Sequence, residues 1–298
     1  VAGQTINRLC DSSMQSIHAA AGAIQMNAGE AFICAGVESM TRVPMTGFNP
    51  LPNPSLAQRL PGAYMGMGTT AENVAKLYKI SRPEQEAFAV RSHKKAAEAQ
   101  GKGYLTEEII AINADGLSAS VDGCIRPETT AEKLAELKPA FDEKGSVTAG
   151  TSSPLTDGAA AALVVSEDFL RANGLRAMAK IRSIAVAGCA PEIMGIGPVA
   201  ATRKALPRAG LTVADIDIIE LNEAFASQSL ACIRDLGLDE SKINLDGGAI
   251  ALGHPLGATG ARITAKAAAL LQRTGKKFAL ATQCIGGGQG IATILEAV

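Results

Sequence analysis

The sequence lacks the features that mark membrane and nucleic-acid-binding proteins. Its 298 residues carry 28 Lys and Arg against 29 Asp and Glu, so no net field draws nucleic acid or anionic lipid to the whole surface. Its apolar runs are far shorter than the ~20 residues that a membrane-spanning helix needs. We therefore expect no nucleic-acid partner and no membrane span.

Paired cysteine motifs are also missing. The six cysteines show no C-x-x-C spacing, which argues against a zinc ribbon or a thioredoxin-type couple and favours a reduced, cytoplasmic compartment. No signal peptide is visible, yet the sequence opens at Val1 in what resembles the middle of an element. We expect a fragment of a longer protein, whose targeting these residues do not reveal.

The apolar pattern predicts alternating strands and helices, which is typical of a layered α/β protein. A helix is expected over residues 11–28 and a buried strand over 31–35. Residues 44–62 are rich in Pro, Gly and Asn, and they open a middle region that looks like an inserted domain, with helices over 70–78 and 82–100. Strands over 158–165 and 179–186 follow, and further elements over 216–221, 222–236, 242–245, 257–274, 277–281 and 290–295 complete the alternation.

Cys10 stands at the N-terminal edge of the first expected helix. Unpaired N–H groups and the helix dipole at such a position favour the thiolate and lower a thiol pKa that starts near ~8.5. Taken alone, a cysteine here is more often an inert core residue. Asp11 would raise the pKa of the adjacent thiol, so a nucleophilic Cys10 needs a base.

His254 is the candidate base. It lies in the Gly-rich connection 253–260 between a strand and a helix, where its ring can point into a cleft. The chain has only two other histidines, and both lie within expected helices. We interpret His18 and His93 as structural or solvated.

Cys284 and Asn222 complete the set of candidates. Cys284 ends a strand and opens a turn over 285–288 that can aim successive N–H groups at a developing oxyanion, although a tight hairpin with an incidental cysteine explains it equally well. Asn222 lies at a strand-to-helix junction, where an N-cap is the simpler interpretation.

These segments together resemble the thiolase family, and most closely its 3-ketoacyl-CoA thiolases of fatty acid β-oxidation. The resemblance covers essentially the whole chain. It extends to five further segments: Gly68-Thr69-Thr70-Ala71-Glu72-Asn73-Val74-Ala75, Ile125-Arg126-Pro127, Thr148-Ala149-Gly150-Thr151-Ser152-Ser153, Asp157-Gly158-Ala159-Ala160 and Met194-Gly195-Ile196-Gly197-Pro198.

The resemblance implies a thiolase fold: two related layered α/β halves (αβαβα) with an inserted loop domain that binds coenzyme A. We expect residues 1–42 and 154–176 to form the N-terminal half, without its first part. The loop domain would span 43–153 and the C-terminal half 177–298.

By this resemblance, Cys10 carries the acyl group, His254 activates it, and Cys284 is the acid and base at the acetyl-CoA carbon. Asn222 and His254 would form one oxyanion hole, and the N–H groups of Cys10 and Gly286 the other. Asp11 departs from the Gly, Ala or Ser more usual at its position. The residues expected to contact coenzyme A are Arg126 near the adenine, Ser153 near the pantetheine, and Met67, Leu137, Phe141 and Phe225 along the tunnel; without the resemblance, a surface salt bridge and core packing would explain them.

The implied activity is that of an acetyl-CoA C-acyltransferase, which cleaves 3-ketoacyl-CoA with coenzyme A as co-substrate, gives acetyl-CoA, and requires no permanently bound cofactor or metal. A homodimer or homotetramer is expected, and a hydratase-dehydrogenase partner stays open. An acetoacetyl-CoA thiolase and an inactive thiolase-like fragment that binds coenzyme A or lipid remain alternatives. A ketoacyl synthase is disfavoured, because it needs a second catalytic histidine where Cys284 stands.

Overall fold

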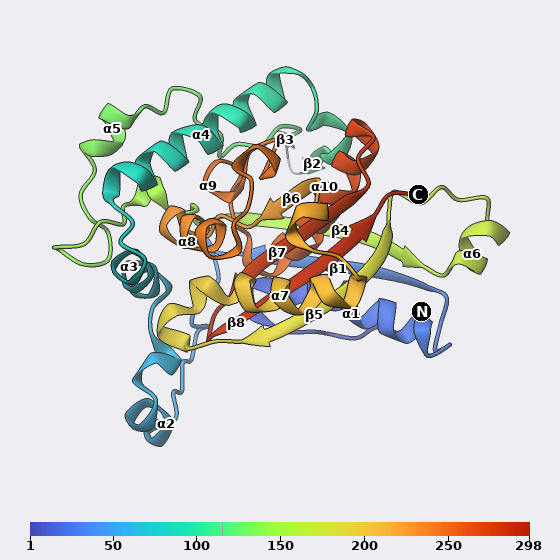
Figure 1. The fold of residues 1–298 in the computed structure, drawn as a ribbon, viewed down its shortest axis with the longest axis horizontal. Coiled ribbons are helices and arrows are strands. Elements are labelled where there is room, and N and C mark those ends of the chain that lie inside the picture. Colours follow the sequence, from blue (N-terminus) through green and yellow to red (C-terminus); the bar gives the residue numbers. More distant parts are fainter. Residues whose placement is uncertain (115) are drawn as a thin grey trace.

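The computed structural model describes residues 1–114 and 116–298 and forms a layered α/β structure (Figure 1). Asp115, which falls in the expected loop domain, lies outside the described residues. The two largest sheets share α10 (Leu256–Thr274), which packs against strands of both. This helix therefore joins the early and late parts of the chain.

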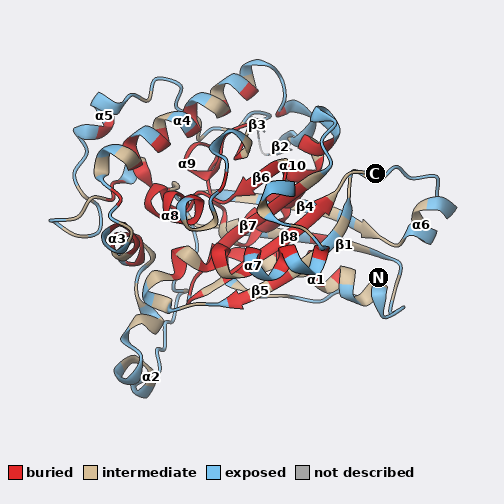
Figure 2. Cartoon of the chain, in the orientation of Figure 1, coloured by how far each residue is buried: buried red, intermediate tan, exposed pale blue. Residues whose placement is uncertain are grey.

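The larger sheet is built from the second half of the chain and has the strand order β5-β8-β7-β6. β7 and β8 form an antiparallel hairpin, β5 adds to β8 antiparallel, and β6 lies parallel to β7. Nearly every residue of β6, β7 and β8 is buried, as the red strands of Figure 2 show. The four strands are Lys180–Gly188 (β5), Ile218–Leu221 (β6), Phe278–Ile285 (β7) and Gln289–Glu296 (β8).

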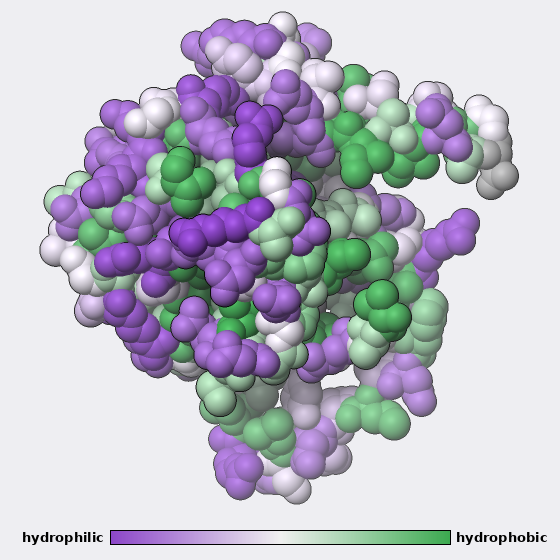
Figure 3. Space-filling view, turned by 90° about the vertical axis from the view of Figure 1, so that its right-hand side faces the viewer, coloured by the Kyte–Doolittle hydropathy of each residue, from purple (hydrophilic) through white to green (hydrophobic). Residues whose placement is uncertain are grey.

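The smaller sheet pairs β1 (Ala31–Ser39) with β4 (Asp157–Val165) in antiparallel register. α1 (Ser12–Gln25) and α10 contact both strands, and Cys34 is buried there at 2% exposure. Side chains alternate across a strand, so the opposite face carries Ile33 and Val37, which are 80% and 76% exposed. Figure 3 shows this side of the molecule, where apolar side chains lie mainly toward the right of the view and hydrophilic ones cover most of its left.

The middle region is mainly helical and lies beside the larger sheet (Figure 1). Its longest helix, α4 (Arg82–Gly101), begins with a capping box between Ser81 and Glu84 and has Pro83 in its first turn. The other α-helices and the remaining strand pair of the described residues are α2 (Pro54–Arg59), α3 (Met67–Leu77), β2 (Ile112–Ala114), β3 (Leu117–Ala119), α5 (Ala131–Ala135), α6 (Glu167–Ala172), α7 (Gly197–Ala209), α8 (Ala226–Leu236) and α9 (Ala249–Leu252).

Most expected elements are confirmed, with bounds that shift by a few residues. Two predictions are wrong. Residues 242–245 form no strand, because a short 3-10 helix ends at Lys242 and only an isolated bridge joins Ile243 to Ile219. The helix expected from residue 222 begins at Ala226, which leaves four residues as a loop between β6 and α8.

Within the described part of the chain, no helix has the length and apolar character needed to cross a bilayer. Large side chains such as Leu280 and Ile285 are instead buried in the core of the larger sheet. Fully burying one such side chain contributes roughly 1.5–3 kcal/mol. Burial of these side chains therefore stabilises the sheet whose strand β7 leads to the candidate site.

Candidate active site

Cys10 lies in a short 3-10 helix, Leu9–Asp11, which runs directly into α1. Leu9 adopts a left-handed φ of 50°, a conformation that costs a non-glycine residue roughly 1–2 kcal/mol. The carbonyl of Cys10 accepts a hydrogen bond from Gln283 of β7 at 2.5 Å. This bond joins the start of the chain to the strand that carries Cys284.

The Cys10 thiol is buried, at 9% exposure. Burial raises its pKa to about 11, although the nearby backbone N–H of Gly286 acts to lower it. The charge of Asp11 raises the pKa further, as the sequence predicts. In the free protein, Cys10 is therefore a protected thiol that needs a base before it can attack.

His254 follows α9 and is buried at 4% exposure. Burial, assisted by the charge of Arg262, lowers its pKa to about 3, so the ring is neutral near pH 7. Its Nδ1 atom lies 2.7 Å from the Thr259 hydroxyl, which itself donates to the Pro255 carbonyl at 3.2 Å. The hydroxyl oxygen can then accept from Nδ1–H, which leaves the lone pair on Nε2. A neutral ring in this tautomer is suited to accept a proton.

Asn222 lies in the loop after β6, and its Nδ2 atom is 3.4 Å from Nε2 of His254. The N-cap interpretation of Asn222 is wrong, because Phe225 occupies the N-cap of α8. The Asn222 backbone N–H donates to the Thr282 carbonyl at 3.0 Å, which fixes the loop against β7. The side-chain amide of Asn222 therefore does not cap α8 and lies beside His254.

Cys284 is the penultimate residue of β7 and is 2% exposed. Burial raises its pKa well above the usual value, and the nearby Cys10 raises it further. The turn that follows is a tight hairpin, in which Gly287 and Gly288 have φ values of 77° and 86° that favour glycine. The expected hairpin is thus confirmed, and its turn brings Gly286 against the nucleophile segment, where a Cβ atom at Gly286 would lie 3.3 Å from Cδ1 of Leu9.

Apolar side chains from the middle region close one side of this site. Met67 packs against a buried cluster that contains Cys284 and Phe225. The Phe225 ring meets Phe141 edge-to-face, with centroids 5.9 Å apart and planes at 85°. Three of the four residues expected to line a tunnel therefore lie together, and the fourth, Leu137, is 37% exposed on the same loop as Phe141.

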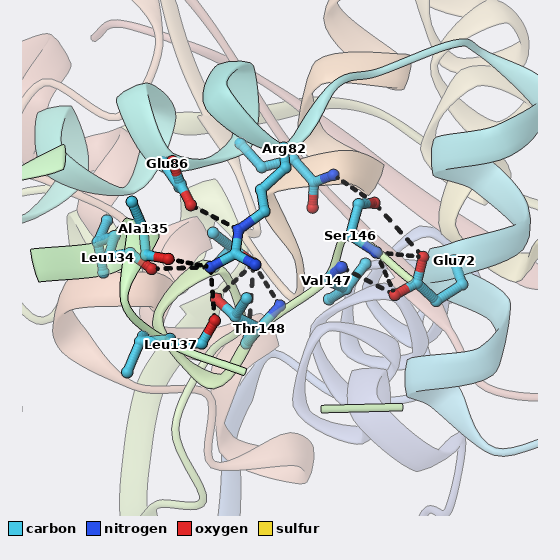
Figure 4. Close-up of polar contacts among 11 residues, drawn as sticks. Glu72, Arg82, Glu86, Leu134, Ala135, Leu137, Ser146, Val147 and Thr148 are labelled. Atoms are coloured by element: carbon cyan, nitrogen blue, oxygen red, sulfur yellow. Dashed lines mark hydrogen bonds and ion pairs between the residues drawn. The ribbon is translucent and has the colours of Figure 1, made fainter. Parts of the chain in front are cut away.

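Two polar networks fix the loop that carries Leu137 and Phe141 (Figure 4). The buried carboxylate of Glu72, on α3, accepts from the N–H groups of Ser146 at 2.9 Å and Val147 at 2.8 Å. The Arg82 guanidinium donates to the carbonyl oxygens of Leu134 and Ala135 at the end of α5 and to that of Leu137, where the loop begins. The two ends of the loop are thus tied to α3 and α4.

The two polar residues expected to contact coenzyme A, Arg126 and Ser153, are each held by a hydrogen bond from the backbone N–H group. Arg126 is exposed, and its N–H donates to Nδ1 of His93 at 3.1 Å. Ser153 is half-buried, and its N–H donates to the Ala224 carbonyl at 3.0 Å. His93 is therefore structural, and His18, whose Nε2 lies 2.8 Å from the Thr293 hydroxyl, is structural as well.

Sequence reasoning missed the residues that support the site, among them Glu223. Its buried carboxylate accepts from Ser92, Asn244 and the N–H of Ile250, so it ties the loop after β6 to α4 and α9. Thr259 and Gln283 were missed in the same way. Glu223 and Gln283 are polar residues directly next to the candidates Asn222 and Cys284, which was the available signal for them. Their position in the sequence does not show which residues they bond to.

Comparison with known proteins identifies the family. The model for the thiolase N-terminal domain matches residues 1–168, and the model for the thiolase C-terminal domain matches residues 175–297. The chain belongs to the thiolase family. The α/β architecture is accordingly a thiolase fold with N- and C-terminal thiolase domains.

Several thiolases resemble this one over nearly its whole length. The 3-ketoacyl-CoA thiolase of Shewanella denitrificans is 56% identical, with 99% of this chain and 78% of the relative covered. That of Marinobacter nauticus is 53% identical, with 100% and 78% covered. This thiolase also resembles two crystal structures at a TM-score of 0.90.

One of these structures is human mitochondrial 3-ketoacyl-CoA thiolase in complex with CoA, which is 43% identical, with 98% of this chain and 77% of that chain covered. The other is the Bacillus anthracis acetyl-CoA acetyltransferase, which is 40% identical, with 100% and 79% covered. The resemblance to both thus spans the candidate site.

Proposed function

We propose that this thiolase is an acetyl-CoA C-acyltransferase that cleaves 3-ketoacyl-CoA with coenzyme A. The observation that carries the proposal is the contact between the two ends of the chain, where the Gln283 side chain of β7 donates to the Cys10 carbonyl at 2.5 Å. This bond places the Cys10 thiol close to Cys284 and to the backbone N–H of Gly286, and both neighbours affect the pKa values of the site. The names of the relatives support the same activity.

In the first half of the reaction, the thiol proton of Cys10 passes to Nε2 of His254 and the sulfur attacks the 3-keto carbon. The N–H groups of Cys10 and Gly286 stabilise the oxyanion of the adduct. Collapse of the adduct breaks the bond between the α- and β-carbons and leaves an acyl group on Cys10. The departing acetyl-CoA carbanion takes a proton from Cys284, and its enolate oxygen is stabilised by Asn222 and His254.

In the second half, Cys284, now a thiolate, removes the thiol proton of incoming coenzyme A. The coenzyme A sulfur attacks the acyl-Cys10 thioester, and the product is an acyl-CoA shortened by two carbons. The Cys10 thiolate is then the leaving group and regains its proton from His254. Across the two halves of the reaction, the bond between the α- and β-carbons and the thiol S–H bond of coenzyme A are broken, and one thioester bond and one C–H bond are formed. No electrons are exchanged with an outside donor or acceptor, so no redox cofactor takes part.

The proposed coenzyme A site lies in the loop domain over residues 43–153. The aromatic and aliphatic side chains beside Cys284 would hold the pantetheine arm, and the exposed Arg126 would meet the adenine end. We assign Ser153 to the pantetheine, and the tunnel to Met67, Leu137, Phe141 and Phe225.

We further propose that residues 1–42 with 154–176 and residues 177–298 are two related halves of the αβαβα type. This chain covers 78% of the length of the Shewanella denitrificans relative. A homodimer or homotetramer in the cytoplasm fits the family, and a hydratase-dehydrogenase partner remains to be tested.

The test is peptide mass spectrometry after brief incubation with a 3-ketoacyl-CoA and an acid quench. We expect an acyl adduct on Cys10 that disappears when coenzyme A is added. Cys10→Ser should abolish the adduct, while Cys124→Ser, at a half-buried cysteine, should leave it intact. A folded protein without the adduct would contradict the proposal and favour a binding scaffold. An adduct with acetoacetyl-CoA alone would favour an acetyl-CoA C-acetyltransferase, the activity named for the Bacillus anthracis structure.

A further inference from the structure

Asp11 is a buried carboxyl group directly after the nucleophile, and the proposed mechanism does not use it. Its side chain is 0% exposed, and neither carboxyl oxygen has a hydrogen-bond partner among the described residues. A buried carboxyl without a donor is costly, and such groups concentrate where they serve a reaction.

The fold makes room for this carboxyl at one glycine of α10. A Cβ atom at Gly260 would lie 2.9 Å from Oδ1 of Asp11 and 2.4 Å from the N atom of Met14. Any side chain at Gly260 would therefore displace Asp11 and the first turn of α1. The carboxyl is packed between the nucleophile segment and α10, away from solvent.

Few charges oppose or support an ionised Asp11. The elements packed against Leu9–Asp11 are α1, β7 and α10. Besides Asp11 itself, the titratable or charged groups on these elements, on the segment and on β1 are Cys10, His18, Cys34, Glu38, Arg262, Lys266, Arg273 and Cys284. Arg8 directly precedes the segment, and Glu30 directly precedes β1. Among them, Arg8 is the group whose charge favours ionised Asp11, while Asp11 and Glu38 both disfavour a Cys10 thiolate.

We propose that Asp11 is a positioning residue that competes with Cys10 for the single negative charge this buried pocket accepts. Burial raises the pKa of both groups, that of Asp11 well above its ordinary value and that of Cys10 to about 11, and the charge of Asp11 adds to the rise at Cys10. The reference acidity of a carboxyl is several pH units stronger than that of a thiol, so Asp11 loses its proton to solvent first. Its charge then keeps Cys10 protonated until His254 takes the thiol proton during catalysis.

The proposal rests on Cys10 being the nucleophile of the proposed function, but its test needs no substrate. The rate at which iodoacetamide alkylates Cys10 is measured against pH, with peptide mass spectrometry to separate Cys10 from the other cysteines. In Asp11→Asn, the competing charge is absent. We expect the rise of the alkylation rate to move toward lower pH by about one unit, which is about tenfold faster alkylation below the plateau.

Glu220 provides the matched control. It is a carboxyl at 1% exposure with an unpartnered Oε1, but it lies on β6 and burial raises its own pKa to about 8. Glu220→Gln should leave the Cys10 profile unchanged. An equal shift in both variants would show a general effect of removing a buried charge and would overturn the proposal, as would an unchanged profile in folded Asp11→Asn.

A second measurement covers the case in which Asp11→Asn does not fold. Infrared spectra of the unsubstituted protein are taken against pH before and after alkylation of Cys10, which removes the thiolate as competitor. We expect the carboxylate band of Asp11 to appear at a lower pH than the one at which Cys10 becomes reactive. Alkylation of Cys10 should not change the pH at which this band appears. A carboxyl that stays protonated after the thiolate has formed would contradict the order proposed. Formation of the acyl adduct remains a separate test, so a failure of this proposal is distinguishable from a failure of the proposed function.

Discussion

The Nδ1 atom of His254 lies 2.7 Å from the hydroxyl oxygen of Thr259, five residues further along the chain. Because Thr259 donates its own proton to the Pro255 carbonyl, the hydroxyl can accept only from a ring protonated at Nδ1. The orientation and tautomer of the candidate base are therefore set by the first turn of α10.

Replacement of this hydroxyl tests that relationship. In Thr259→Val the Nδ1–H loses its buried acceptor, which costs about 1–3 kcal/mol and corresponds to a decrease in kcat of roughly 10-fold to 100-fold. Thr274→Val removes a hydroxyl from the other end of the same helix, where it donates to the Leu270 carbonyl, and should leave kcat unchanged. Steady-state kinetics with a 3-ketoacyl-CoA measures both; equal losses in the two variants would mean that the effect comes from the helix and not from His254.

A close approach of two backbones predicts a large loss of stability at Gly197. A Cβ atom there would lie 2.1 Å from the carbonyl oxygen of Gln289 at the start of β8. Gly197→Ala should lower the free energy of unfolding by roughly 1–3 kcal/mol or more, because backbone must move to admit the methyl group. Urea unfolding followed by circular dichroism measures the loss.

The matched control is Gly22→Ala. Gly22 lies within α1 and has open space where a Cβ would be placed. Alanine is favoured over glycine by about 0.5–1 kcal/mol in a helix, so this variant should be slightly more stable than the parent. Destabilisation of both variants to the same degree would contradict the explanation by close approach.

The Glu72 carboxylate predicts a local effect on the loop that carries Phe141. Glu72→Gln replaces one of two acceptor oxygens with an amide group that cannot accept from Ser146 or Val147. Hydrogen bonds to a charged group contribute roughly 1.5–3 kcal/mol each, so hydrogen exchange at these two amides should accelerate about 10-fold or more. Glu143→Gln, at an exposed position of the same loop, should not change it. Protection that is equal in both variants would show that the loop is held by other contacts.

Buried histidines predict how stability responds to acid. Burial lowers the pKa of His18 and of His254 to about 3, whereas in the unfolded chain each titrates near ~6.5. The unfolded state therefore binds more protons between these values, and the free energy of unfolding falls as pH falls from about 6.5, by up to about 1.4 kcal/mol per unit for each histidine.

His18→Gln should reduce that dependence. The variant removes one of the two titrating rings while Gln can still bond to Thr293. Urea midpoints taken across this pH range should then fall less steeply than in the parent. A slope as steep as that of the parent would assign the acid sensitivity to groups other than His18.

The sequence predicted the elements and the residue types of the site better than it predicted the contacts. Helical periodicity placed α1, the capping residue Ser81 with Pro83 placed α4, and apolar runs placed strands of both main sheets. Residues 242–245 were mistaken for a strand because a short apolar run does not show whether it has a partner for its backbone. The local pattern at Asn222 was misread as an N-cap, because asparagine is favoured at the start of a helix and the pattern does not show at which residue the helix begins.

Residues that hold the candidate site in place, such as Gln283 and Gly260, could not be predicted because their partners are distant in the sequence. The partner of Gln283 is the Cys10 carbonyl, 273 residues away, and no local pattern encodes such a pair. The same holds for Gly260, whose requirement for glycine comes from the packing of Asp11 and Met14 against α10. Side-chain identity suggested the chemistry, while the partners followed from the packing of distant segments.

The long span between Cys10 and Gln283 has a consequence for biosynthesis. A chain that emerges from the ribosome exposes its nucleophile segment long before β7 and β8 have been made, so the pocket around the sulfur cannot close during most of translation. Pairs this far apart in sequence also form slowly, because the loop between them must be ordered first. In the nascent protein the thiol is thus open to oxidation and to passing electrophiles, and its protection begins only when the last hairpin has docked.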